Sequence, residues 1–434
     1  MTRPDGSAAT VGGAPLLQAA LRAGGVDAVY GAAMAGLAVT PVASPDLAAL
    51  LARAHRRVHG RAAASLGGRT MTLPGPDPDL ITVESLADVA TLPGRLAAAR
   101  DRGAVVTLDV DTRAEAAGVA LESPPAASTW LEPAPQALAA LERAERPVVL
   151  AGPGVVGRAS VPGLHALAAA GHLGVLNTWG AKGVFNWQSR HHLATIGLQA
   201  LDFALGGLPG SDLVIATGLD PDESPPERWQ LGPFIEVEPR ALSLLAERSS
   251  RSWPWPTVPE LRQGLAAVTQ EGWADSTTPL APSLVTRNYG AALGDGGRVA
   301  ADAGTAGFWL ARTFGTTELG SAQVPAVDEP GFAAAVALVT RLRSPARPVL
   351  AVVDGVPSDA TLELLELADS LAVGFGVEAW SGDGEILDAG EHLARARELA
   401  VVERSTVATV ATSSWQLERI LDVAGPVIAW GGLR

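Results

Sequence analysis

The sequence contains no cysteine. This absence excludes disulfide bonds, thiolate nucleophiles and cysteine-based zinc sites, and it fits the reducing cytoplasm, where we expect the protein to be located. Positive charge is also scarce, because 32 Lys and Arg residues stand against 46 Asp and Glu, and the formal net charge is −14. With no basic stripe along the chain, we expect no nucleic-acid partner and interpret the excess acid as a solvated surface.

Long, strongly apolar runs are absent as well. The segments Ala28–Pro45 and Ala159–Ala181 carry no Asp, Glu, Lys or Arg, but they are rich in Gly and Ala and contain Pro. A membrane-spanning helix needs about 20 strongly apolar residues, so we reject both as spans. The N-terminus lacks the apolar core of a signal peptide. We therefore expect no association with a membrane.

What the chain does contain is a regular alternation of short apolar runs and longer Ala/Leu-rich stretches. The strand candidates are Val26–Tyr30, Ala104–Asp109, Pro147–Ala151, Leu173–Asn177, Asp212–Thr217, Phe234–Val237, Arg298–Asp302, Pro348–Val353, Gly374–Ala379, Ala400–Glu403 and Pro426–Trp430. The helical stretches include Leu16–Ala23, Pro45–His59, Gln136–Ala144, Ser283–Leu293 and Ala360–Leu371. Most strand candidates are continuous Val/Ile/Leu runs, which is typical of strands covered on both faces. The repeated strand-then-helix order predicts doubly wound parallel sheets.

Two proline-rich segments interrupt this alternation, and we interpret both as interdomain linkers. They are Ser123–Pro135 and Ser249–Pro282. A chain of 434 residues is long enough for two or three domains. The linkers predict three of them, over residues 1–125, 135–245 and 280–434.

The middle block carries a recognisable series of motifs. A strand enters a Gly-rich turn, and a second strand leads to the turn Thr178-Trp-Gly-Ala-Lys-Gly183. The strand Asp212–Gly218 follows, and the block closes on Ile235–Pro239. In this order and spacing the motifs resemble the central domain of the thiamine-diphosphate (ThDP) enzymes, such as acetolactate synthase, pyruvate oxidase and benzoylformate decarboxylase.

The two outer blocks resemble the other two domains of that family. Residues Leu16–Gly31, with the helix that follows Ser44, are similar to the pyrimidine-binding domain. Residues Arg298–Gly304 and Pro330–Gly355 are similar to the diphosphate-binding domain, although both outer blocks look shortened. The resemblance implies an α/β fold of three doubly wound parallel-sheet domains: pyrimidine-binding-like, central and diphosphate-binding-like.

The resemblance also implies site residues. Asp46 falls at the position of the family's catalytic Glu, and Asp354 falls at the metal-binding Asp of its Gly-Asp-Gly motif, which would hold Mg²⁺ and the diphosphate of ThDP. Asp302, Gly304 and Gly355 are the matching cofactor-binding positions. For Asp46 an alternative is favoured, because it follows Ser44-Pro45 and can be a helix N-terminal acid facing the helix dipole.

The departures from the family pattern fall at the positions that would contact the cofactor. Asp46 is one methylene shorter than Glu, and Val353 replaces the Gly before the metal Asp. The family's metal-binding Asn, which follows that Asp, is missing: the only asparagines are Asn177, Asn186 and Asn288. We therefore expect a cofactor-impaired, non-catalytic subunit that associates with itself or with a full-length homologue. The alternative is an active ThDP- and Mg²⁺-dependent 2-oxoacid decarboxylase or carboligase.

Three other patterns suggest ligands less strongly. The sequence Gly152–Gly157 matches G-x-G-x-x-G, but the second strand is not followed by the acid that holds a ribose, so FAD or another nucleotide in the central domain is a disfavoured third hypothesis. His55 and His59 stand four apart without the Glu or third ligand of a metal helix. Lys182 is interpreted as a turn residue rather than a Schiff-base lysine.

Overall fold

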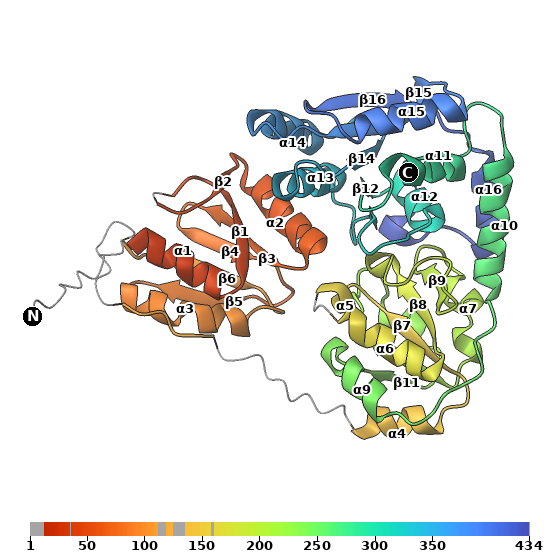
Figure 1. Cartoon of the computed structure of the whole chain (residues 1–434), viewed down its shortest axis with the longest axis horizontal. Coiled ribbons are helices and arrows are strands. Elements are labelled where there is room, and N and C mark those ends of the chain that lie inside the picture. Colours follow the sequence, from red (N-terminus) through yellow and green to blue (C-terminus); the bar gives the residue numbers. More distant parts are fainter. Residues whose placement is uncertain (1–12, 35, 112–118, 125–134, 158–159, 434) are drawn as a thin grey trace, which may run out of the picture. The chain divides into compact units, whose positions relative to one another are not determined.

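The computed structural model describes residues 13–34, 36–111, 119–124, 135–157 and 160–433. The chain forms two compact units, residues 1–130 and 131–434 (Figure 1). Most of the first predicted linker, residues 125–134, lies outside the described residues. The predicted boundary between the second and third blocks falls inside unit 2, and the three-domain division stays a prediction. Among the described residues, no helix is both long and apolar enough to cross a membrane.

Unit 1 contains a six-stranded sheet in the order β2-β1-β3-β4-β6-β5. Its elements are α1 (Gly13–Ala23), β1 (Val26–Gly31), β2 (Thr40–Pro41), α2 (Pro45–His59), β3 (Ala62–Gly67), β4 (Thr70–Leu73), β5 (Asp79–Val83), α3 (Leu86–Ala98) and β6 (Ala104–Leu108). Helix α2 packs on β1 and β3, and α1 packs on α3. Buried side chains of α1, α3, β1 and β3 to β6 form one hydrophobic core.

The sheet of unit 1 is not parallel throughout, which differs from our expectation. Strand β4 runs antiparallel to both of its neighbours, β3 and β6. The cause lies in the connection Gly68–Arg69, which is only two residues long. A parallel pairing needs a crossover of about a dozen residues, so this link can only reverse the chain direction. Gly68 has a φ of +60°, which suits such a tight turn.

The start of helix α2 is fixed by its sequence. Ser44 caps the helix and accepts a hydrogen bond from the amide of Leu47 at 3.3 Å, and Pro45 occupies the first helical position. Gly60 ends the helix with a left-handed φ of +63°. Asp46 lies in the first turn with its side chain exposed. A negative charge at the N-terminal end of a helix interacts favourably with the helix dipole.

Unit 2 begins with a five-stranded, fully parallel sheet in the order β11-β10-β7-β8-β9. Its elements are α4 (Pro135–Arg143), β7 (Pro147–Ala151), α5 (Gly154–Gly157), α6 (Val161–Gly171), β8 (Gly174–Thr178), η1 (Trp179–Ala181), β9 (His192–Ile196), α7 (Asp202–Leu205), η2 (Leu208–Gly210), β10 (Leu213–Thr217), α8 (Pro226–Trp229), β11 (Phe234–Glu236), η3 (Pro239–Ala241) and α9 (Leu242–Arg248). Strands β7, β8 and β10 coincide with the predicted Val/Ile/Leu runs to within one residue at each end.

The second half of unit 2 holds another parallel sheet, in the order β13-β12-β14-β15-β16. Its elements are α11 (Pro282–Leu293), β12 (Arg298–Ala301), α12 (Thr305–Thr313), β13 (Ala322–Gln323), α13 (Phe332–Arg343), β14 (Val349–Asp354), α14 (Asp359–Ser370), β15 (Gly376–Glu385), α15 (Ala389–Leu399), β16 (Thr406–Val410), α16 (Trp415–Ala424) and η4 (Ala429–Gly431).

Three of our local predictions for this half were wrong. The apolar runs Ala400–Glu403 and Pro426–Trp430 are not strands, and the last strand is β16 instead. Strand β16 lies at the sheet edge with mostly exposed or half-buried residues, so its apolar signal is weak. The predicted linker Ser249–Pro282 contains helix α10 (Glu260–Ala274), whose 15 residues are free of proline between the two proline clusters.

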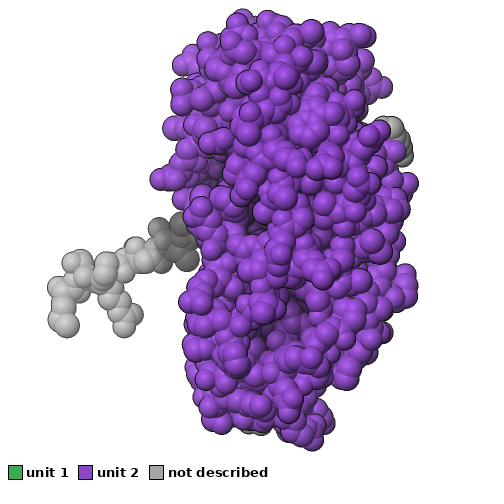
Figure 2. All heavy atoms as spheres, turned by 90° about the vertical axis from the view of Figure 1, so that its right-hand side faces the viewer, with its two compact units in different colours: residues 1–130 green, residues 131–434 purple. Residues whose placement is uncertain are grey.

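The two sheets of unit 2 share buried side chains and form one continuous body, seen in Figure 2 from the side that carries α10. Trp179 and Leu198 come from the first sheet region and Val268 from α10, yet all three pack in the core of the second sheet. Helix α10 itself packs on α11 and α16. The segment predicted as a linker therefore contributes directly to the packing of unit 2.

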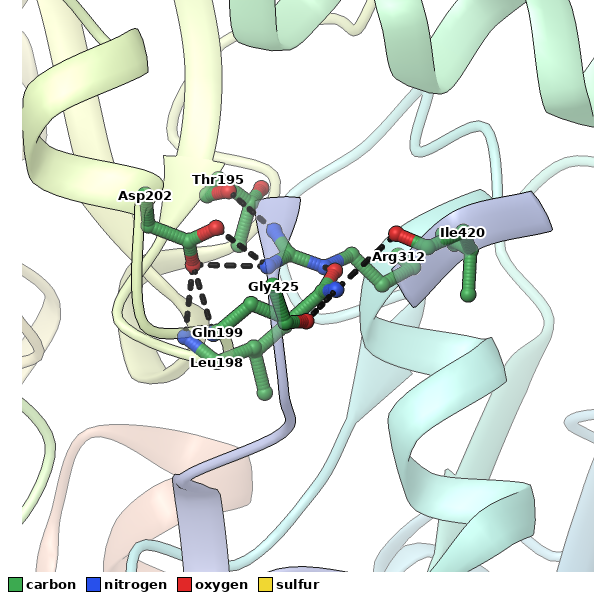
Figure 3. Close-up of polar contacts among 7 residues, drawn as sticks. All are labelled: Thr195, Leu198, Gln199, Asp202, Arg312, Ile420 and Gly425. Carbon is green, nitrogen blue, oxygen red and sulfur yellow. Dashed lines mark hydrogen bonds and ion pairs between the residues drawn. The ribbon is translucent and has the colours of Figure 1, made fainter. Parts of the chain in front are cut away.

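A buried polar network ties the two sheets together (Figure 3). Arg312 of α12 contacts both carboxylate oxygens of Asp202, at 2.5 and 2.7 Å, and its Nε donates to Gln199 at 3.0 Å. The Gln199 amide donates in turn to the carbonyls of Ile420 and Gly425. Both charged side chains are fully inaccessible to solvent. Because this ion pair is complete and hydrogen-bonded, it can be buried without leaving an uncompensated charge.

Candidate cofactor site

The predicted cofactor residues of unit 2 gather at one edge of the second sheet. Strands β12 and β14 are parallel neighbours, so their carboxyl ends lie at the same edge. Asp302 directly follows β12, and Asp354 is the last residue of β14. The structure thus brings Asp302, Gly304, Asp354 and Gly355 to one place, which in open α/β sheets is the usual position of a ligand crevice.

Both carboxylate oxygens of Asp354 accept hydrogen bonds from backbone amides at the start of helix α12. Oδ1 accepts a hydrogen bond from the amide of Ala306 at 2.9 Å, and Oδ2 accepts one from the amide of Thr305 at 2.5 Å. Gly304 makes this approach possible, because a Cβ at that position would lie 2.3 Å from Asp354 Oδ2. Its φ of +120° also favours glycine. Asp354 therefore acts as the N-terminal cap of α12.

Asp302 makes the equivalent contacts to helix α13. Its Oδ1 accepts a hydrogen bond from the amide of Ala333 at 2.7 Å, and its Oδ2 accepts one from Gly331 at 3.0 Å. These amides belong to the first turn of α13, which otherwise has no side-chain cap. The two acids at this edge therefore fix two helices to the ends of two neighbouring strands.

Burial disfavours the ionised forms of Asp302 and Asp354. Burial raises the pKa of Asp302 to about 6, and the neighbouring carboxylates Asp354 and Asp328 act in the same direction against the Gly331 and Ala333 amides. Burial also raises the pKa of Asp354, and the amides of Ala306 and Thr305 partly offset it. The edge thus already holds two buried carboxyl groups, which disfavour a further negative charge there.

Other predicted site residues have structural partners. The ring of His55 contacts Tyr30 at Nδ1 (2.8 Å) and Asp27 at Nε2 (3.0 Å), which leaves neither nitrogen for a metal. Among the described residues, no group of three His, Cys, Asp or Glu side chains is placed to hold a metal ion. Asn288, the asparagine nearest the third block's motif, donates to His392 and to the carbonyl of Ala389.

The G-x-G-x-x-G segment forms a close turn between strands. A Cβ on Gly152 would lie 2.4 Å from the carbonyl oxygen of Gly218, which follows the neighbouring strand β10. Gly154 opens the single-turn helix α5 and its amide donates to the same carbonyl at 2.8 Å. The glycines thus allow the ends of β7 and β10 to approach each other closely.

Sequence reasoning missed a fully buried acid in the third block. Glu378 of β15 accepts a hydrogen bond from the Tyr289 hydroxyl, and its Oε2 lies 3.1 Å from His392 Nε2. The Trp380 indole donates to the same hydroxyl at 2.7 Å. Burial, followed by the charge of Glu378, raises the pKa of Tyr289 well above its usual range. The sequence feature that could have identified this acid is a Glu within the apolar run around β15.

Comparisons with known proteins agree with this architecture. Residues 135–246 match the family model for the central domain of thiamine pyrophosphate enzymes. A solved X-ray structure from Mycobacterium smegmatis, assigned as a thiamin diphosphate-dependent enzyme, is similar with a TM-score of 0.67 and 14% sequence identity over 93% of this chain and 100% of that one. No curated protein matches the sequence.

The fold is therefore that of an α/β protein with three parallel-rich sheets, as the sequence predicted. Residues 135–246 thus match the central domain of thiamine pyrophosphate enzymes in sequence, and 93% of the chain is similar in fold to a solved structure of that description. The structural match alone, at 14% identity, concerns the fold.

Proposed function

We propose that this chain is a cofactor-impaired member of the ThDP enzymes of acetolactate-synthase type that serves as a non-catalytic subunit. In this proposal it works in the cytoplasm and assembles with itself or with a full-length homologue. The observation that carries the proposal is the pair of contacts from Asp354 to the amides of Thr305 and Ala306.

These contacts oppose diphosphate binding in two ways. The amides at a helix N-terminus are a ready site for phosphate, but in α12 the Asp354 carboxylate already occupies the first two. A phosphate at this position would also meet the negative charges of Asp354 and Asp302, with no basic side chain among the residues that contact them.

The same edge is poorly suited to Mg²⁺. This ion requires near-octahedral oxygen coordination, usually from carboxylates, waters and substrate phosphate. Asp354 is the one acid of the predicted motif, and both of its oxygens accept amide hydrogen bonds from α12. Asn288, the asparagine closest to the motif in the sequence, is held against α15 by its Nδ2, which donates to His392 and to the Ala389 carbonyl, and it is not among the described residues that hydrogen-bond to Asp354. The residues present therefore do not fit the metal and diphosphate that the family resemblance implies, which supports a role without ThDP catalysis.

Asp46 remains the predicted counterpart of the catalytic Glu. Its exposed place in the first turn of α2 supports the alternative that it stabilises the helix dipole. The competing hypothesis of an active decarboxylase or carboligase assigns Asp46 the catalytic role and Asp354 the metal.

Isothermal titration of the full chain with ThDP and Mg²⁺ tests the proposal, with an active ThDP enzyme as positive control. We expect no saturable heat at millimolar ThDP. A dissociation constant in the micromolar range contradicts the proposal, and turnover of a 2-oxoacid that Asp46→Ala abolishes would establish the active enzyme instead. Light scattering of the chain, alone and mixed with a full-length homologue, tests its assembly.

A further inference from the structure

Lys182 is the only lysine among the 434 residues, and it is buried. The other 31 of the 32 Lys and Arg residues are arginines. Lys182 follows the short helix η1 and is 9% exposed. Among the described residues its ammonium group has no hydrogen-bond or ion-pair partner, although a buried charge normally requires one. Its side chain lines a cavity of about 130 Å³ inside unit 2.

The turn that presents Lys182 is held rigidly. The buried carboxylate of Glu223 accepts hydrogen bonds from the Thr178 hydroxyl at 2.5 Å and from the Gly180 amide at 2.8 Å. The Trp179 indole donates to the carbonyl of Pro325 at 2.9 Å, which anchors η1 to the second sheet. The position of Lys182 beside the cavity is therefore specified by its surroundings.

The cavity is lined by basic, aromatic and neutral polar side chains and by no carboxylate. Its lining comprises Lys182, Trp187, His192, Ala194, Thr195, Arg262, Leu265, Ala266, Thr269, Gln270, Trp273, Arg312, Thr313, Phe314 and Gly315. These residues come from the loop after η1, from β9, from α10 and from α12 with the residues directly after it. The cavity thus lies where the two sheets of unit 2 meet α10.

The positive charge of the cavity is only partly compensated. Arg312 is paired with the buried carboxylate of Asp202. Arg262 donates to the carbonyls of Trp187 at 2.9 Å, of Ser189 at 3.4 Å and of His192, but it contacts no acid. Burial, with the charge of Arg312 added, lowers the pKa of Lys182 to about 7. Among the described residues, Lys182 and Arg262 are therefore two basic groups without an acidic partner.

Part of the cavity lining is aromatic and apolar. The rings of Trp187 and Trp273 meet edge to face, with centroids 6.2 Å apart and an interplanar angle of 89°. Phe314 and Leu265 add apolar surface. Aromatic walls of this kind favour a ring or another flat apolar group in van der Waals contact.

We propose that this cavity binds a small organic carboxylate with a flat apolar body, its charge beside Lys182 and Arg262 and its ring against Trp187 and Trp273. The volume of about 130 Å³ is close to the roughly 150 Å³ of a closed cavity that holds benzene, and the cavity is partly open to solvent, so a ligand with one ring can extend beyond it. The site uses none of the residues of the Asp354 edge and does not depend on the proposed function.

Benzoate is a suitable probe, because it combines one charge with one ring. Isothermal titration and thermal unfolding of the full chain should show saturable binding of benzoate and a raised melting temperature. Benzamide, which keeps the ring without the charge, and inorganic phosphate, which keeps the charge without the ring, should each bind at least tenfold more weakly. Equal binding of benzamide, or no binding of benzoate, overturns the proposal.

Single-residue variants distinguish benzoate binding in this cavity from non-specific binding elsewhere on the protein. Lys182→Met keeps the length of the side chain and removes the charge, and it should weaken benzoate binding at least tenfold. Lys182→Arg should restore it. The matched control is Arg190→Met, which removes an exposed positive charge that stacks on Trp255 outside the cavity. Circular dichroism checks that each variant is folded. Loss of binding in Arg190→Met to the same degree contradicts the assignment to this cavity.

Discussion

The carboxylate of Asp354 lies 2.9 Å from the backbone amide of Ala306 and closes the N-terminus of α12. A residue that the sequence predicted at a metal-binding position thus caps a helix in this chain. Asp302 and the start of α13 repeat the arrangement one strand away. The stability of two helices accordingly depends on the two acids at the candidate site.

We expect Asp354→Ala to lower the free energy of unfolding by about 1–2 kcal/mol, because it leaves the amides of Thr305 and Ala306 without an acceptor. Asp354→Asn retains one acceptor oxygen and should lose less. Urea denaturation at neutral pH measures both. The control is Asp383→Ala at an exposed position, which should change stability by less than about 0.5 kcal/mol. An unchanged midpoint in Asp354→Ala would refute the capping role.

Asp302 should make unit 2 less stable as the pH rises. Its pKa is about 6 in the folded chain against an ordinary value of 3.8, so the folded state binds the proton more tightly than the unfolded state. Its contribution to stability is complete below pH 4 and is lost as pH rises through 6, by up to about 3 kcal/mol. The stability of Asp302→Asn relative to the unmodified chain should therefore increase from pH 4.5 to 7. A difference that does not vary with pH would show that Asp302 titrates normally.

The ion pair of Arg312 and Asp202 should contribute strongly to the stability of the packing between the two sheets of unit 2. Arg312→Leu leaves a fully buried Asp202 unpaired, and we expect it to lower the free energy of unfolding by about 3–5 kcal/mol. The double variant with Asp202→Leu should lose less than the sum of the two single variants. Calorimetry should also resolve separate transitions for the two sheets when the network is broken. Additive single losses would show that the side chains act independently.

The sequence predicted the elements whose signals are local. Strands β7, β8 and β10 are continuous apolar runs, and α2 begins with a Ser-Pro cap and ends with Gly60, so their positions were predicted within a residue. Strand β3 is rich in Ala, β4 has only four residues, and β4 and β9 both contain polar residues, so no apolar run marks them. Their pairing depends on partners elsewhere in the sheet.

The candidate site was predictable only in part, for a similar reason. The order of motifs identified Asp302 and Asp354, but their role as caps depends on β12 and β14 being neighbours. Lys182 lies in a turn motif, and nothing local shows that it is buried. Its cavity is completed by α10, within the segment whose prolines predicted a linker. When a helix is stabilised mainly by tertiary packing, its sequence gives little indication of it beyond the helix propensity of its residues.

Benzoate binding should weaken as the pH rises above 7. The anion favours the charged form of Lys182, whose pKa is about 7 in the free protein, so above that value each bound anion must also take up a proton. The affinity should fall by up to tenfold per pH unit until the pKa of the bound state is reached. Of the other ionisable groups at the cavity, Arg312 is paired with Asp202, Arg262 donates to backbone carbonyls, and burial holds the pKa of His192 at about 3. Titrations between about pH 6 and 9, where benzoate itself stays ionised, should show this fall in the unmodified chain and a flat profile in Lys182→Arg, whose guanidinium keeps its charge. A flat profile in both would show that the ligand does not contact Lys182.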